Sequence, residues 1–213
     1  VALVAILWGA LVALGQTNLK RRIAYTSVNH MGYIVMALGA AGLIAGSTAE
    51  ARSIAVTGAV TQMVSHGLIT GALFLLAGVL YDRAGTYELD AYGGLAGAAP
   101  KLATLFAVGA FASLGLPGFS GFIAEFQMFT GSIAAAPVTA VALPGIVITA
   151  ALFLRAFQQV FTGPADGRSD GFVDLRVHET ASTAMLLALS LVIGVLPGPL
   201  LALIEPAADT VIG

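Results

Sequence analysis

Three side chains that can take up and release protons lie inside stretches of sequence that are otherwise apolar. They are His30, His66 and Glu125. Histidine titrates near neutral pH, and an ionisable side chain at membrane depth is costly enough to indicate a function by default. The chemistry that fits these residue types is proton transfer between buried groups. The alternative is that each one is a buried polar side chain whose hydrogen bonds a neighbouring helix satisfies.

Neutral polar residues accompany one of the two histidines. Gln62 and Thr70 lie four residues before and after His66, so a helix would place all three side chains on one face. We expect Gln62 and Thr70 to support proton transfer as polar neighbours. Arg155 lies near the end of its apolar stretch, where a long side chain can reach the membrane surface. His178 lies in a polar loop, and we expect no role in transport for it.

A helix break precedes Glu125 directly, in the stretch Gly115-Leu-Pro-Gly-Phe-Ser-Gly-Phe-Ile-Ala-Glu-Phe126. Its proline lacks a backbone donor, and its three glycines lower helix propensity. Unwound backbone at membrane depth is tolerated only where protein buries it or where it lines a wet cavity. A proline kink that neighbouring helices repair is the alternative. We predict a structural break formed by Gly115, Pro117, Gly118 and Gly121.

Apolar runs of roughly 17 to 25 residues or more must position these side chains, and such runs are long enough to cross a bilayer as helices. We predict an all-α membrane protein with six transmembrane helices, the fourth discontinuous, in a single membrane domain over residues 1–213. The chain starts inside an apolar run without an initiator methionine, so we expect it to be the C-terminal part of a longer subunit. The predicted spans are 1–17, 23–46, 53–81, 101–131, 138–162 and 180–203.

The composition excludes several classes of protein. Of the 213 residues, 58% are hydrophobic and only 9% are charged, with a mean hydropathy of +0.96, which is far more apolar than a soluble domain. A net charge of −2 gives no basis for binding nucleic acid. Without cysteine the chain has no disulfide or iron–sulfur ligand, and its three histidines form no metal-binding motif. We therefore expect no metal and no cofactor in this chain.

The distribution of Lys and Arg predicts the orientation of the chain. If the chain changes sides after every span, eight of the nine basic residues fall on one side, and only Arg52 falls on the other. Such an excess marks the cytoplasmic side of a multi-pass protein. We predict a location in the cell inner (cytoplasmic) membrane, with both termini on the outer side. The basic loops 18–22, 82–101 and 155–179 are predicted to be cytoplasmic.

Small residues are spaced for close helix packing in the predicted third span. Gly67 and Gly71 have the small-xxx-small spacing that lets two helix backbones approach each other. We expect them to make a contact within the bundle, and a specific dimer contact is the alternative.

Three ordered motifs carry a family resemblance over nearly the whole chain. They are Lys20-Arg-Arg-Ile-Ala-Tyr-Thr-Ser-Val-Asn-His-Met-Gly32, Gln62-Met-Val-Ser-His-Gly67 and the stretch from Gly115 to Phe126. Together they resemble the antiporter-like proton-pumping subunits of respiratory complex I, and the match is to the chain M type of bacterial NADH–quinone oxidoreductase. Glu125 favours that type, since several sister subunits carry lysine at the corresponding position.

The resemblance implies a fold and a function. The six spans would correspond to the second half of an antiporter-like fourteen-helix bundle, with His30, His66 and Glu125 transferring protons through it. The chain would be a proton-translocating membrane-arm subunit of an enzyme, NADH–quinone oxidoreductase, and would contain no redox chemistry itself. Its partners would be the lipid bilayer and the other membrane-arm subunits, through which it would be linked indirectly to quinone and NADH.

Two alternatives stay open. The same fold serves multisubunit sodium/proton antiporters and membrane-bound hydrogenases, so the chain could belong to either. The polar residues could also lock helix packing in a purely structural membrane scaffold.

Overall fold

The computed structural model describes residues 1–163 and 171–213, and every regular element within them is a helix. Two of these elements, η1 and η2, are short 3-10 helices. The elements are α1 (Ala2–Gly15), α2 (Leu19–Ala41), α3 (Ala49–Ala84), η1 (Leu89–Ala91), α4 (Leu95–Ala98), α5 (Pro100–Ser113), α6 (Ser120–Ala135), η2 (Pro137–Ala142), α7 (Pro144–Phe161), α8 (Val177–Val195) and α9 (Gly198–Ile212).

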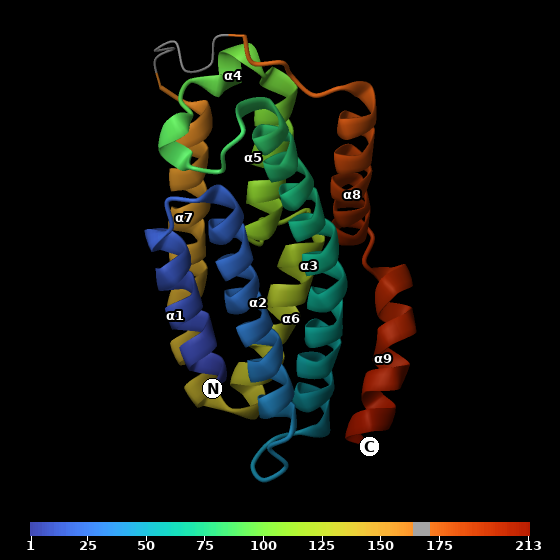
Figure 1. Cartoon of the computed structure of the whole chain (residues 1–213). Helices are drawn as coiled ribbons and strands as arrows, with labels where there is room; N and C mark the ends of the chain where they lie inside the picture. Colours follow the sequence, from blue (N-terminus) through green and yellow to red (C-terminus); the bar gives the residue numbers. More distant parts are fainter. Residues whose placement is uncertain (164–170) are drawn as a thin grey trace.

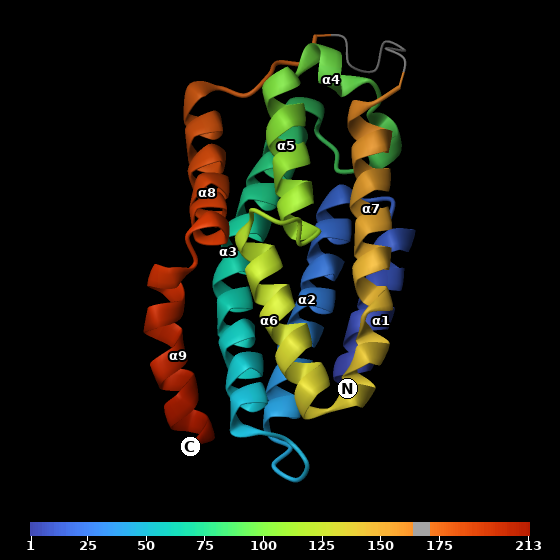
Figure 2. The same cartoon turned by 180° about the vertical axis from the view of Figure 1, so that it is seen from behind.

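The long helix α3 is the element against which most of the bundle packs. It contacts α2, α5, α6, α8 and α9. Two pairs of shorter helices follow its length end to end: α5 is succeeded by α6, and α8 is succeeded by α9 (Figures 1 and 2). Helix α1 packs against α2 and α7. The break between α5 and α6 therefore lies partway along α3, and Leu116 and Pro117 within it are exposed.

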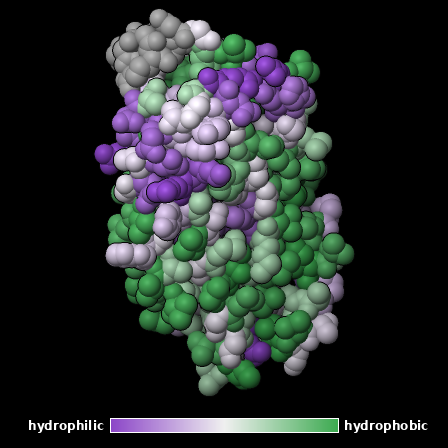
Figure 3. Space-filling view, viewed as in Figure 1, coloured by the Kyte–Doolittle hydropathy of each residue, from purple (hydrophilic) through white to green (hydrophobic). Residues whose placement is uncertain are grey.

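The surface of the molecule is apolar over most of its length, as a membrane protein requires. Among the described residues, three helical segments are long and apolar enough to cross a bilayer, and α1 and α5 are shorter apolar helices. Large apolar side chains such as Trp8 and Val147 are 67% and 69% exposed. Hydrophilic residues gather toward one end of the bundle in Figure 3. The three long segments are Ala49–Ala84, Pro137–Phe161 and Val177–Val195.

The C-terminal helices differ from the predicted sixth span of 180–203. Helix α8 ends at Val195, and a separate helix, α9, continues to Ile212 with Ile204 and Ala208 buried. Two prolines flank Gly198 and interrupt the helix, but proline is well tolerated in the first turn of the helix that follows. The predicted span ends at residue 203, whereas the helix after the prolines continues to Ile212 and packs on α3.

The helix ends at one end of the bundle are held by hydrogen bonds between connecting segments. The carboxylate of Glu88 accepts hydrogen bonds from Thr17 Oγ1 at 3.0 Å and Asn18 Nδ2 at 2.9 Å. These bonds hold the pKa of Glu88 below its usual range. Asp174 accepts from the backbone N–H groups of Lys101 and Leu102, which begin α5. The bonds to Glu88 thus connect the turn between α1 and α2 to the loop that follows α3. The bonds to Asp174 connect the start of α5 to the segment that precedes α8.

Close helix packing occurs at different glycines from those predicted. Nothing lies within 4 Å of the position of a Cβ atom on Gly67, and on Gly71 such an atom would only touch Leu186 at 3.7 Å. On Gly131 of α6, by contrast, a Cβ atom would lie 2.7 Å from the backbone oxygen of Ala51 and would collide with the backbone nitrogen of Ala55. The closest approach of α3 therefore involves α6, the helix that carries Glu125.

Both termini lie at the same end of the bundle, and the connections after α3 and α7 lie at the other end (Figure 1). The predicted basic loops 82–101 and 155–179 belong to that second end, although residues 164–170, including Arg168, lie outside the described residues. The arrangement is compatible with the predicted grouping of basic loops. The side of the membrane on which they lie stays a prediction.

Candidate functional site

Three of the four residues predicted to break the helix, Gly115, Pro117 and Gly118, lie in the connection between α5 and α6, whereas Gly121 lies in the first turn of α6. Helix α5 ends at Ser113, and α6 begins at Ser120. Gly115 and Gly118 have φ angles of +68° and +105°, which L side chains rarely adopt, so glycine is required at both positions. Pro117 lies between them and provides no backbone donor. The helix is therefore interrupted here, between Ser113 and Ser120.

Two glycines of the break bring the start of α6 close to its surroundings. A Cβ atom on Gly121 would lie 2.6 Å from the backbone oxygen of Ala112, so α6 begins in direct contact with the end of α5. A Cβ atom on Gly115 would collide with the carboxyl group of Glu125. The absence of a side chain at position 115 thus leaves the space in which the carboxyl group lies.

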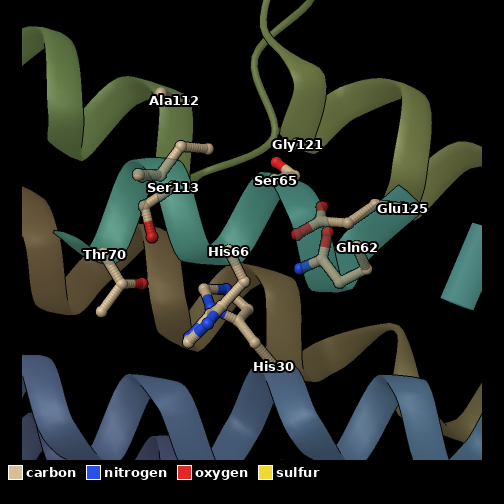
Figure 4. A pocket seen from close by; sticks show the side chains of 10 residues that line it. His30, Gln62, Ser65, His66, Thr70, Ala112, Ser113, Gly121 and Glu125 are labelled. Atoms are coloured by element: carbon tan, nitrogen blue, oxygen red, sulfur yellow. The ribbon is translucent and has the colours of Figure 1, made fainter. Parts of the chain in front are cut away.

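A buried cavity collects the predicted proton-transfer residues from three helices. His30 comes from α2, His66 comes from α3, and Glu125 comes from α6 (Figure 4). The enclosed volume is about 10 Å³, which is room for about one water molecule. The remaining lining residues are Gln62, Ser65, Ile69, Thr70, Ala112, Ser113 and Gly121. Residues separated by almost a hundred positions in sequence therefore share one cavity.

The two histidines contact each other directly. Their ring centroids are 5.5 Å apart with an interplanar angle of 77°, so one ring meets the other edge to face. His30 is only 4% exposed. The Nε2 atom of His66 lies 3.1 Å from Ser27 Oγ, at hydrogen-bond distance. The rings are thus close enough for one bridging water, or a small rotation of a ring, to connect them.

Several polar atoms of the cavity lack a protein partner among the described residues. The Nδ1 atom of His30 and the Oε1 atom of Gln62 are buried without a hydrogen bond. No donor from the described part of the chain forms a hydrogen bond with the Glu125 carboxyl group, which points toward Gln62 in the view of Figure 4. Buried polar atoms usually have a partner, often an ordered water. The cavity therefore has room and polar partners for a hydrogen-bonded water molecule.

A chain of three hydrogen-bonded serines fixes the start of α6, and no motif in the sequence predicts it. The hydroxyl of Ser65 lies 2.8 Å from that of Ser120, which in turn lies 2.7 Å from that of Ser190. All three residues are at most 1% exposed. Ser65 precedes His66, and Ser120 begins α6 directly after the break, so their positions in the sequence are close to candidate site residues. Ser190, on α8, carries no signal in the sequence.

Other residues considered in the sequence lie away from the cavity. Pro117 and Gly118 shape the break but do not line the cavity. Arg155 and His178 are exposed, on α7 and α8. Within residues 1–163 and 171–213, no group of three or more His, Cys, Asp or Glu side chains is arranged to hold a metal ion.

The fold and the cavity together define a class of protein: a multi-pass helical membrane protein with ionisable groups buried beside a helix break. Residues 1–152 match the family described as NADH:quinone oxidoreductase/Mrp antiporter, transmembrane. The chain belongs to this family.

Named relatives and a solved structure agree with this assignment. The chain is 42% identical over 199 residues to "F(420)H(2) dehydrogenase subunit M" of Methanosarcina mazei, covering 93% of this chain and 38% of the relative. It is 38% identical over 209 residues to "NADH-quinone oxidoreductase subunit M" of Mycobacterium tuberculosis, covering 98% and 36%. A chain of respiratory complex I from Thermus thermophilus superposes with a TM-score of 0.87 at 33% identity, covering 100% of this chain and 44% of that one. The chain therefore spans less than half the length of each of these proteins.

Proposed function

We propose that the chain is part of a proton-translocating subunit in the membrane arm of an NADH–quinone oxidoreductase. Protons pass between His30, His66 and Glu125, and quinone reduction in other subunits drives the transfer. Gln62 and Thr70 orient water and side chains along the way. The redox chemistry of the enzyme belongs to partner subunits, and we propose no cofactor in this chain.

The observation that carries the proposal is the convergence of three ionisable groups on one buried cavity at a helix break. A histidine can both take up and release a proton near neutral pH. Ionisable residues inside a membrane are expensive, and they commonly mark proton relays. The cavity has room for about one water, which can bridge groups that do not touch.

The membrane arrangement follows from the same proposal. Helices α5 and α6 together form one discontinuous transmembrane helix, the fourth of six, whose half-helix ends face the cavity. The basic loops are cytoplasmic, and both ends of the chain described here are on the outer side of the inner membrane. The remaining helices of a longer subunit, other membrane-arm subunits and lipid surround the bundle.

A second candidate is supported by the breadth of the family itself. The family description includes Mrp antiporters, and one relative is named for F(420)H(2) rather than NADH. The cavity described above contains no group that distinguishes these systems. A subunit of a sodium/proton antiporter, or of a complex with another electron donor, would use the same residues. The genes beside this one discriminate between these systems, since NADH-binding and quinone-site subunits belong only with the first.

The decisive test separates proton transfer from a scaffold role. In the full-length subunit within its complex, we expect replacement of His30 and His66 by Gln to lower coupled proton transfer in sealed vesicles while the complex still assembles. Glutamine keeps hydrogen-bonding capacity but cannot titrate in this range. If these histidines only lock helix packing, Gln would leave proton transfer intact and only Leu at both positions would impair assembly.

A matched control is available on the surface. His178 is exposed and lies outside the cavity. His178→Gln should leave the number of protons transferred per electron unchanged. Equal losses for the cavity and surface substitutions would contradict the proposed role of the cavity.

A further inference from the structure

A second pocket on the outside of the bundle reaches the same carboxyl group. It lies between the α5–α6 connection, α6 and α7, and its volume is about 240 Å³. Phe126, at its rim, is 61% exposed, and Thr130 is also exposed. The lining residues are Leu114, Gly115, Phe122, Glu125, Phe126, Phe129, Thr130 and Ile146. Glu125 therefore separates a small enclosed cavity on one side from a larger lateral pocket on the other.

The lining of the lateral pocket is suited to one kind of ligand. Glu125 is its only ionisable residue, and the other lining groups are apolar except for Thr130. The rings of Phe122 and Phe126 stack with centroids 5.9 Å apart, and Phe129 adds a third aromatic ring. An ammonium group is attracted both by a carboxylate and by the faces of aromatic rings. An anion would meet only a carboxyl group and would be repelled once that group ionised.

The carboxyl group of Glu125 forms the ionisable part of the pocket lining. Glu125 is 9% exposed, and its carboxyl group has no hydrogen-bond donor within residues 1–163 and 171–213. A buried polar group without a partner is costly. A donor that arrives through the lateral pocket would remove that cost.

We propose that the lateral pocket binds an amphipathic amine that enters from the lipid bilayer. The neutral amine takes the proton of the Glu125 carboxyl group, and the resulting ammonium group pairs with the carboxylate. Its first carbons lie against Phe122, Phe126 and Ile146, while the rest of the hydrocarbon tail extends into lipid. That such a ligand would also block proton transfer rests on the proposed function, whereas the binding site does not.

Access from lipid can be tested by chemical modification of the intact complex in membranes. Dicyclohexylcarbodiimide is an uncharged, lipophilic reagent for protonated carboxyl groups. The carboxyl proton passes to one nitrogen of the reagent and the carboxylate oxygen bonds to its central carbon, and an acyl shift then leaves a stable N-acylurea. We expect mass spectrometry to find this adduct on Glu125. No adduct on Glu125 would overturn lateral access, including the case in which a neighbouring subunit covers the pocket.

The class of ligand is tested by protection against the same modification. We expect dodecylamine to slow labelling of Glu125, and dodecanol, which has the same chain length but no charge, to protect much less. Equal protection by the two compounds, or protection by neither, would overturn the assignment of an amine site.

Matched variants test the aromatic contribution. Phe126→Ala should raise the half-protecting concentration of dodecylamine about three- to tenfold, which is the effect of losing one cation–aromatic contact. Phe111 is also an exposed phenylalanine, 40% exposed on α5, but it does not line the pocket. Phe111→Ala should leave protection unchanged. Equal effects of the two substitutions would contradict the site.

These readouts are independent of proton pumping. Labelling and protection can be measured whether or not Glu125 transfers protons. If protection is found but amine binding leaves proton transfer unchanged, the ligand site stands and the proposed function is in doubt. If labelling fails while Glu125 substitutions impair proton transfer, the lateral site is wrong and the proposed function stands.

Discussion

Glu125 and Gly115 depend on each other at the level of single residues. The space for the carboxyl group exists because position 115 has no side chain, and the positive φ angle at that position also requires glycine. One residue therefore both turns the chain and makes room for the ionisable group. A mutation at position 115 should affect proton transfer even though glycine has no group that can titrate.

Gly115→Ala should impair coupled proton transfer more than Gly118→Ala does. Both substitutions place an L side chain at positive φ, at a cost of roughly 1–2 kcal/mol. Only at position 115 does the added Cβ atom collide with the Glu125 carboxyl group, because nothing lies within 4 Å of the corresponding position on Gly118. The measurement is proton transfer per electron in sealed vesicles, corrected for the amount of assembled complex. Equal losses for the two variants would show that backbone strain alone matters.

The candidate proton-transfer residues could be identified from the sequence because ionisable side chains are rare within its apolar stretches. His30, His66 and Glu125 were identified in this way, and the structure places them around one cavity. Ser190 could not be predicted, since its role depends on a hydrogen bond to a residue 70 positions earlier. Serine is also common in membrane helices as an ordinary packing residue. Its place in the serine chain is a property of the fold alone.

At the scale of helices, hydrophobic runs predicted where elements exist better than where they end. The run 101–131 covers most of α5 and α6, and three of the four residues predicted to break it are not helical, the exception being Gly121 in α6. The sixth run was predicted to end at residue 203, whereas α9 extends to Ile212. The hydrophobicity of a segment beyond a proline does not show whether that segment forms a helix that packs on another part of the protein. Here α3 is long enough to provide that surface for α9.

The glycine spacing in α3 did not predict where α3 packs closely against another helix. Small residues permit two helix backbones to approach closely, but they do not show which helix will do so. In the described structure, no atom lies within 4 Å of the position of a Cβ atom on Gly67. We therefore expect Gly131→Ala to destabilise the protein by about 1–3 kcal/mol, the usual cost of overpacking. Gly67→Ala should be neutral or stabilising by up to about 1 kcal/mol, since alanine is the better helix former. Thermal denaturation of the purified complex would distinguish them, and the opposite order would contradict the α3–α6 contact.

At the scale of the whole molecule, hydrophilic residues gather toward one end of the bundle (Figure 3), three ionisable groups share an internal cavity, and much of the outside is apolar. The family assignment followed from the sequence motifs, and the membrane class followed from the apolar composition. The mutual arrangement of the helices did not, because an apolar helix surface can pack against protein or lipid. The depth of the lateral pocket beside Glu125 is a result of that arrangement and has no signature in the sequence.

The central claim is that Glu125 transfers protons from its buried position, and the number of protons translocated per electron tests it most directly. In sealed vesicles that contain the complete complex, Glu125→Gln should slow proton transfer through this subunit on the order of 10²-fold, as removal of an acid–base group does. The ratio should then fall below the wild-type value. Glu205→Gln, an exposed acid on α9 outside the cavity, should leave it unchanged. A wild-type ratio and turnover in the Glu125→Gln complex would contradict the account.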